Sequence, residues 1–361
     1  MTQPSLPRSK YWSAFSKSLQ AETGAGVEFR WPRHDLTCEA NWPTYLGAEK
    51  NYDCTGTIQF GPGGNYGRAV AELVAEAMRA PSVKFLVVNC HPFLRLGLYL
   101  REIPNIILAD VSLTSSEFAI NPRQISLPSL SLLPKNEIRE NALSTSRPIL
   151  ASFQGTSTHR SRIRLTRIAS DRIVINVFRV DWPIDLSAKE RLRRNTLYSH
   201  LLSQSVFSIV PRGHALFSYR LAEVLECGSI PVFIADQWVP PLHRIIDWGK
   251  CSLTFGEGEI LQIPRVLSAI SPKQIAEMQN RSRQAYKMYF SSPQAACAGV
   301  LEEMRQIKIE PSSHDSAPVL VPGTMDWAAD IKTVAGNYEG RVAPKWVLKL
   351  RALRSEIHTK P

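Results

Sequence analysis

Short apolar segments alternate with helical segments between residues 149 and 236, and this alternation constrains the fold more than any other feature of the chain. The apolar segments are ILASFQG, RIVINVFRV, VFSIVP and IPVFIAD, with the composition of strands that are buried on both faces. Between them lie the helical segments HRSRIRLTRI, SAKERLRRNTLYSHLLSQ and SYRLAEVLECG. Parallel strands need a crossover connection, so the pattern predicts an α/β fold with a parallel sheet. Ligands of such sheets bind beyond the carboxyl ends of the strands.

The rest of the chain carries a second, less regular set of patterns. Strand-like runs and helical runs occur at residues 57–60, 68–80, 83–89, 105–110, 259–270, 272–290 and 293–307. At roughly 100 to 200 residues per domain, a chain of 361 residues suggests two domains. We expect an N-terminal domain at 1–147, a second domain at 148–310, and a loose tail at 311–361 that ends in a basic helix.

The segment VFSIVPRGHALFSYRLAEVLECG has the features of an anion site. A strand precedes a loop that holds Arg212 and Gly213, and Ser218 is placed to cap a helix that ends at Gly228. Free N–H groups and the positive end of the helix dipole at such a helix start favour a diphosphate. Arg212 and Arg220 would add charge-assisted hydrogen bonds to it.

Glu223 lies three residues after Arg220, on the same face of the predicted helix. A carboxylate there can accept both hydroxyls of a ribose. It is five residues after Ser218, so it does not complete a capping box, which needs a spacing of three. The alternative, a surface ion pair between Arg220 and Glu223, fits the spacing equally well.

These pieces resemble a known family. LLSQSVFSIVPRG, SYRLAEVLECGSIPV, PPLHRIIDW and LQIPRVLSAI…YFSS are similar to segments of the exostosin glycosyltransferases, glycosyltransferase family 47, and most of all to the heparan-sulfate-synthesising members. SSEFAINPRQISLPSL and ILASFQG resemble upstream segments of the same family, so the resemblance covers residues 111–307. It implies a GT-B architecture, two Rossmann-like domains facing a central cleft, with the donor nucleotide in the C-terminal one. It also implies inverting transfer of a sugar, usually from a UDP-sugar, to an acceptor.

The resemblance also implies an arginine near the donor phosphates, shortly after the Phe-x-Gly strand. Arg162 matches that spacing, and Arg160 and Arg164 are close rivals. The alternative is a solvated basic helix face. No Asp-x-Asp pair occurs in the chain, so arginines and helix dipole would take the place of a metal at the leaving diphosphate. We therefore expect no metal and no cofactor besides the nucleotide-sugar co-substrate.

An inverting displacement needs a base for the acceptor hydroxyl, from the N-terminal side of the cleft. His91 follows one predicted strand, Asp110 ends the next, and Glu117 lies in the family-like SSEF segment. For each of the three, the alternative is a structural role at the end of a strand or in a loop.

The turn GPGGNYG fails the Gly-x-Gly-x-x-Gly test because Tyr66 stands where the third glycine belongs. Two interpretations stay open for it, an approach to acceptor or phosphate and a plain tight turn.

The formal charge of +11 is concentrated in two stretches. Residues 160–194 hold ten basic and four acidic residues, and residues 341–360 hold six basic and one acidic. The predicted basic helix at 345–357 has three interpretations: packing on the N-terminal domain, contact with an anionic membrane near a lipid-linked acceptor, or contact with nucleic acid. The first is favoured, and the absence of a recognition motif predicts no nucleic-acid partner.

The function predicted from sequence is transfer to a glycan or lipid-linked acceptor in polysaccharide or glycoconjugate synthesis. The alternative from another class is a catalytically inactive subunit of the same fold that binds carbohydrate or nucleotide. No apolar run approaches the ~18 to 20 residues of a membrane span, and the N-terminus lacks the apolar core of a signal peptide. We therefore expect a soluble, cytoplasmic protein with at most peripheral contact to a membrane.

Overall fold

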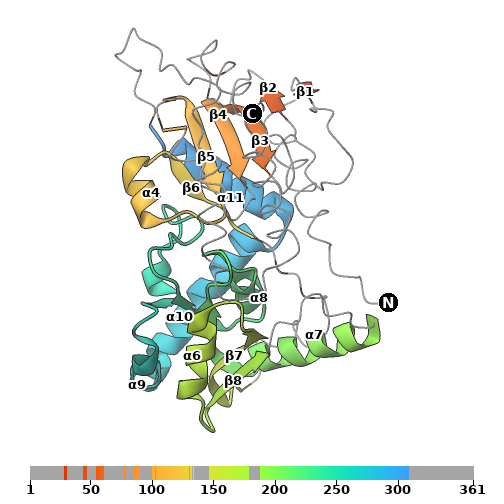
Figure 1. Cartoon of the computed structure of the whole chain (residues 1–361), viewed down its shortest axis with the longest axis vertical. Coiled ribbons are helices and arrows are strands. Elements are labelled where there is room, and N and C mark those ends of the chain that lie inside the picture. Colours follow the sequence, from red (N-terminus) through yellow and green to blue (C-terminus); the bar gives the residue numbers. More distant parts are fainter. Residues whose placement is uncertain are drawn as a thin grey trace, which may run out of the picture.

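The computed structural model describes residues 103–129, 146–178 and 188–308, four strands nearer the N-terminus, and a few single residues beside these ranges (Figure 1). The predicted basic helix at 345–357, His91 and the GPGGNYG turn lie outside the described residues.

The larger sheet has five parallel strands in the order β8-β7-β9-β10-β11. The strands are β7 (Ile149–Thr156), β8 (Ile173–Phe178), β9 (Ser205–Pro211), β10 (Ile230–Ile234) and β11 (Leu253–Phe255). The strands β7 to β10 fall on the four segments predicted as strands. Val232 and Ile234 of β10 pack in one core cluster and Phe233 in another, because both faces of the sheet are covered. The order places β8 on one side of β7 and all later strands on the other, as in doubly wound nucleotide-binding sheets.

The smaller sheet has four parallel strands in the order β3-β4-β5-β6. They are β3 (Cys54–Phe60), β4 (Lys84–Asn89), β5 (Ile106–Asp110) and β6 (Gln124–Ser126). A separate antiparallel pair is formed by β1 (Glu28–Arg30) and β2 (Thr44–Leu46). The expected α/β class with two parallel sheets is therefore confirmed.

The α-helices are α4 (Ser115–Ile120), α6 (Arg160–Arg164), α7 (Ala188–Ser203), α8 (Arg220–Glu226), α9 (Ile263–Ser268), α10 (Pro272–Ala285) and α11 (Pro293–Arg305). Shorter helical segments are η1 (Leu165–Ile168), η2 (Trp248–Lys250), η3 (Ile260–Gln262) and the π-helical η4 (Tyr286–Phe290). Local sequence explains the starts of α10 and α11. Ser271 and Gln274 form a capping box before α10, and the Ser292 hydroxyl caps α11, each with proline at the start of the helix.

The two sheets are joined by a shared core and by direct backbone contacts. The Ser115 N–H donates to the Gln237 carbonyl at 2.8 Å, and the Val239 N–H to the Leu113 carbonyl at 3.0 Å. One core cluster contains residues of β4, β5 and β6 together with residues of α8 and α11. In Figure 1 the strands β3 to β6 lie in the upper half of the view and β7 and β8 in the lower half, with α8 and α11 between them. The segments 113–115 and 237–242 therefore form the junction of the two halves.

Among the residues that the structure describes, no helix is both long enough and apolar enough to cross a membrane.

Candidate functional site

The carboxyl ends of β7 and β9 lie side by side at the point where the strand order reverses, which is where α/β sheets of this kind bind ligands. Two glycines allow arginines to come close at this edge. A Cβ atom on Gly155 would lie 2.7 Å from Nη2 of Arg220, and one on Gly213 would lie 3.2 Å from Nη2 of Arg162. The structure therefore brings Arg162, Gly213 and Arg220 together with Gly155 of the predicted strand ILASFQG at one edge of the larger sheet.

Arg162 is a buried tie between β7 and the loop after β9. Its Nε donates to the Arg212 carbonyl at 2.8 Å, its Nη1 to the Thr156 carbonyl at 3.2 Å and its Nη2 to the Pro211 carbonyl at 3.3 Å. Burial, and then the nearby Arg220, lower the pKa of Arg162 to about 9. Arg160 and Arg164 on the same helix are exposed, whereas Arg162 holds the glycine loop against the strand.

Arg220 lies between two aromatic rings. Its guanidinium carbon is 4.7 Å from the ring centre of Phe153 on β7 and 5.1 Å from that of Tyr198 on α7. Its Nη1 donates to the Tyr198 hydroxyl at 2.7 Å, while its Nε is buried without a hydrogen-bond partner among the described residues. Stacking and hydrogen bonding thus fix the guanidinium at the carboxyl edge of the sheet.

Glu223 is linked to Arg220 through Tyr198, because the same hydroxyl donates to Oε2 of Glu223 at 3.0 Å. Burial raises the pKa of Tyr198 well above its ordinary value, so the hydroxyl keeps its proton. Sequence reasoning missed Tyr198. The only signal was a tyrosine on a predicted helix, whose polar tip needs a partner once the ring is buried.

The helix α8, which carries Arg220 and Glu223, is shorter than the sequence suggests. It begins at Arg220, with Tyr219 in the cap position, so the prediction that Ser218 is its cap residue is wrong by one position. The Ser218 hydroxyl still accepts from the Arg220 N–H at 3.3 Å. Gly228 has a φ of 66° just after the helix, the left-handed geometry that lets glycine end a helix.

A buried carboxylate, that of Glu257, lies beside two arginines and a histidine at this edge. Oxygens of Glu257, on the turn after β11, lie 3.8 Å from Nδ1 of His159, 3.8 Å from Nε of Arg160 and 3.8 Å from Nη1 of Arg212. The Glu257 N–H donates to Oδ1 of Asp236, which follows β10, at 2.9 Å. Among the described residues, no group of three or more His, Cys, Asp or Glu side chains lies close enough together to hold a metal ion. The ionisable groups described at this edge are arginines, one histidine and the carboxylates of Glu223, Asp236 and Glu257.

Sequence reasoning also missed Glu257. Its side chain is 5% exposed, and burial raises the pKa of its carboxyl, with Asp236 acting in the same direction and Arg212 and Arg160 against it. A glutamate between two glycines gives no local signal of such a neighbourhood, because the arginines come from other strand ends.

On the smaller sheet, Asp110 ends β5 and is enclosed by hydrogen bonds. Its Oδ2 accepts from Nδ2 of Asn89, at the end of β4, at 2.6 Å, and its Oδ1 accepts from the Ser112 N–H at 2.7 Å. Asp110 is therefore a buried structural acceptor in this structure, and His91, which follows Asn89 by two residues, lies outside the described residues.

Glu117 is part of a capping box at the start of α4. Its Oε2 accepts from the Thr114 N–H at 3.1 Å and from the Thr114 hydroxyl at 2.7 Å, while the Glu117 N–H donates to that hydroxyl at 3.1 Å. The structural alternative thus explains the position of Glu117.

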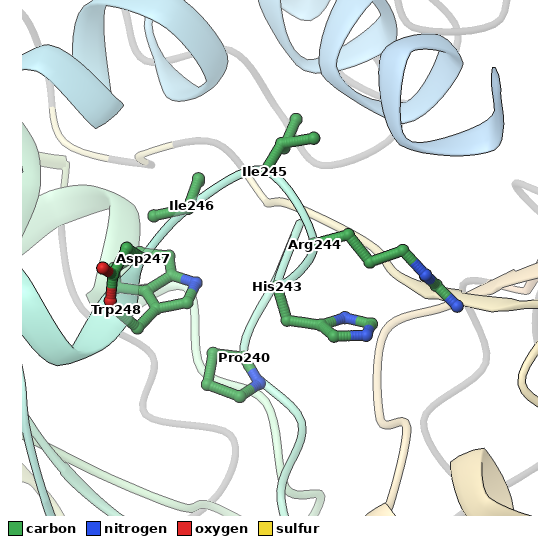
Figure 2. A pocket seen from close by; sticks show the side chains of 7 residues that line it. All are labelled: Pro240, His243, Arg244, Ile245, Ile246, Asp247 and Trp248. Atoms are coloured by element: carbon green, nitrogen blue, oxygen red, sulfur yellow. The ribbon is translucent and has the colours of Figure 1, made fainter. Parts of the chain in front are cut away.

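A hollow of about 440 Å³ opens beside the loop before η2, and none of the predicted site residues lines it (Figure 2). His243 and Arg244 extend to the same side of this loop in Figure 2. Arg244 donates to the Gln124 carbonyl at 2.8 Å and to Oε1 of the fully buried Glu303 at 2.9 Å, and it stacks on Phe118. This cluster fastens the junction between the two sheets. It shares no residue with the carboxyl ends of β7, β9 and β11 and their side chains Arg160, Arg162, Arg212, Arg220 and Glu257, which we call the arginine edge.

Comparison with known proteins places these observations in a family. A family model described as the Exostosin GT47 domain matches residues 85–270, just over half of the 361 residues. The chain is 28% identical over 180 residues to an Exostosin-1 homolog of Caenorhabditis elegans, which covers 46% of this chain and 47% of that relative. It is 31% identical over 119 residues to Exostosin-2 of Homo sapiens, covering 32% of this chain and 17% of the relative. The chain therefore spans less than half the length of these two relatives.

Among solved structures, WaaG, a glycosyltransferase involved in lipopolysaccharide biosynthesis, aligns over 81% of this chain and 96% of that chain at 13% identity. The TM-score of 0.38 supports no conclusion beyond that similarity. The family match includes the carboxyl ends of β7, β9, β10 and β11 and every described residue at the arginine edge. The chain therefore belongs to the exostosin GT47 glycosyltransferase family.

Proposed function

We propose that this protein is an inverting glycosyltransferase that moves a sugar from a UDP-sugar to a hydroxyl of a glycan or lipid-linked acceptor. One observation carries the proposal: Arg160, Arg212, Arg220 and Glu223 converge at the carboxyl ends of β7 and β9, inside the matched family domain. That edge is where a doubly wound sheet binds a nucleotide.

The roles follow from the charge that the reaction develops. Negative charge gathers on the departing diphosphate as its bond to the sugar breaks, and positioned cations stabilise it. Arg160 and Arg212 are suited to the phosphates because both project toward the same point at this edge. The Glu223 carboxylate, steadied by the Tyr198 hydroxyl, is suited to accept the ribose hydroxyls.

The base that takes the acceptor proton belongs to the opposite half in this proposal. Asp110 and Glu117 are each engaged in hydrogen bonds that serve local structure. Of the three candidates from sequence, His91 is therefore the one that we propose for the role, on its position two residues after β4.

The decisive experiment is a titration with UDP and 2′-deoxy-UDP, joined to a turnover screen over UDP-sugars. We expect Glu223→Ala to weaken UDP binding at least about tenfold and to abolish the preference for UDP over 2′-deoxy-UDP. Glu277→Ala, on the exposed face of α10, is the matched control and should bind both as the wild type does. Unchanged discrimination in Glu223→Ala would refute the ribose role. UDP binding without turnover of any donor would favour the inactive, nucleotide-binding alternative.

A further inference from the structure

The four arginines predicted to meet the donor fall into two pairs. Three nitrogens of Arg162 donate hydrogen bonds to backbone carbonyls, and the Arg220 guanidinium stacks on Phe153 and Tyr198. The other two, Arg160 and Arg212, face Glu257. The cations best placed to receive phosphates are thus the ones that lie beside a buried carboxylate.

The contacts of Glu257 are long for ion pairs. The two arginines and His159 each lie 3.8 Å from its oxygens, whereas a charge-assisted hydrogen bond is about 2.7 to 2.9 Å. The carboxylate therefore attracts the arginines without a close hydrogen bond to any of the three. Its backbone N–H donates to the Asp236 side chain, and its own side chain is 5% exposed, so the carboxylate lies at the edge of the sheet with little contact to water.

The direction of the pKa shift of Glu257 agrees with these long distances. Burial raises the pKa of Glu257 although Arg212 and Arg160 oppose the shift, so the cations only partly compensate for loss of water. A second anion bound to the same arginines would repel the Glu257 carboxylate, in addition to the cost of removing that carboxylate from water.

We infer that Glu257 is a built-in counter-ion that competes with the nucleotide diphosphate for Arg160 and Arg212, so that it lowers nucleotide affinity and speeds product release. The inference rests on the proposed function, since it concerns the same diphosphate site. A free nucleoside diphosphate carries about one more negative charge near pH 7 than the diester in a nucleotide sugar, because its terminal phosphate ionises with a pKa near 6. Glu257 therefore repels the product more strongly than the donor.

The test is calorimetric titration of the full chain with UDP, with inorganic pyrophosphate, and with uridine as a neutral probe. Glu257→Gln keeps the shape and removes the charge, and it should bind UDP and pyrophosphate about tenfold more tightly at low ionic strength, with uridine affinity unchanged. Glu277→Gln makes the same charge change on exposed α10 and should match the wild type. Glu257→Ala is a second variant with the same loss of charge, and circular dichroism and thermal melting check that each variant folds.

Three outcomes overturn the inference alone. If UDP affinity is unchanged in the folded variants, Glu257 does not compete, and if it falls, Glu257 instead binds the nucleotide or its sugar. Failure of both variants to fold would likewise overturn it, because Glu257 would then be needed for the structure itself. A wild-type chain that binds no UDP overturns the proposed function, and this inference with it.

Discussion

Polar residues lie at the carboxyl edges of both parallel sheets, but the distances between their carboxylates and the neighbouring polar groups differ. At the end of β5, Asp110 accepts hydrogen bonds of 2.6 and 2.7 Å from Asn89 and Ser112. At the ends of β7, β9 and β11, Arg160 and Arg212 stay 3.8 Å from Glu257. The Asp110 carboxylate thus accepts close hydrogen bonds, whereas the Glu257 carboxylate makes no close hydrogen bond to its two arginines.

This difference separates structural from ligand-binding polarity. A buried polar group that is fully paired stabilises the fold, and a group held short of its partner is a candidate for contact with a ligand. Arg162 and Tyr198 explain how the second edge stays ordered, because they tie the loop and the neighbouring side chains to the sheet. The substitutions below test whether stability and nucleotide affinity divide between the edges in this way.

The largest effect is expected at Arg162. Arg162→Met removes three hydrogen bonds to carbonyls and should lower the free energy of unfolding by about 3 kcal/mol, measured by urea denaturation. Arg164→Met, two residues along the same short helix but exposed, should change it by less than about 0.5 kcal/mol. A stable Arg162→Met protein that has lost only UDP affinity would instead make Arg162 the phosphate contact expected from sequence.

Asp110→Ala should be the next most damaging change. It leaves the buried Asn89 amide and the Ser112 N–H without these acceptors and should cost about 2 kcal/mol of unfolding free energy. Thermal and urea unfolding measure the loss, and Asp171→Ala, at an exposed turn, is the control. UDP affinity of the folded variant should equal that of the wild type. Full stability with loss of turnover would show that Asp110 acts on substrate.

Much of the larger sheet could be predicted from sequence, because β7 to β10 are apolar and are separated by segments whose apolar residues recur at the spacing of a helix. The three-residue strands β6 and β11 are too short to give such a signal. The helical pattern at 259–270 divides into η3 and α9 because Pro264 can start a helix but cannot continue one. The helical pattern predicted there is confirmed for residues 260–268, which are helical without a break.

The spacing of residues predicted the candidate site where its residues share one segment, and the family resemblance added Arg160 and Arg162 from a second one. Arg212, Gly213, Arg220 and Glu223 lie within twelve consecutive residues, so their spacing is visible in the sequence. Glu257 reaches the site from another strand end, which no local pattern records. The carbonyls that Arg162 contacts are backbone groups, and backbone acceptors have no sequence signature.

The junction between the two sheets should respond to pH through His243. Burial, and then Arg244, lower the pKa of His243 to about 4, and its Nδ1 lies 3.3 Å from Oε1 of Glu303. A histidine with a lowered folded-state pKa contributes stability that is present above pH 6.5 and is lost as pH falls toward 4. We expect the stability difference between wild type and His243→Gln to shrink by about 1 to 2 kcal/mol from pH 7 to pH 4, because solvent screens the partly exposed ring.

Subtracting the unfolding free energy of His243→Gln from that of the wild type at each pH removes the opposing contribution of Glu303, which both proteins contain. Burial raises the pKa of Glu303 although Arg244 opposes the shift, so its own contribution improves as pH falls. Urea unfolding at pH 7, 5.5 and 4 measures the difference. A difference that does not vary with pH would mean that His243 titrates in the folded protein as it does in water.

The smallest effect, and the sharpest test of the arginine edge, is expected from Tyr198→Phe. The phenyl ring keeps its stacking on Arg220 and loses only the hydroxyl that bridges Arg220 and Glu223. UDP affinity should fall about fivefold, equivalent to about 1 kcal/mol, measured by titration. Tyr289→Phe, on η4, loses a similar hydrogen bond of 3.2 Å to Glu302 on α11, and should leave UDP affinity unchanged. Equal UDP affinities in the two variants would mean that Tyr198 stabilises the fold as Asp110 does, without positioning the side chains that meet the nucleotide.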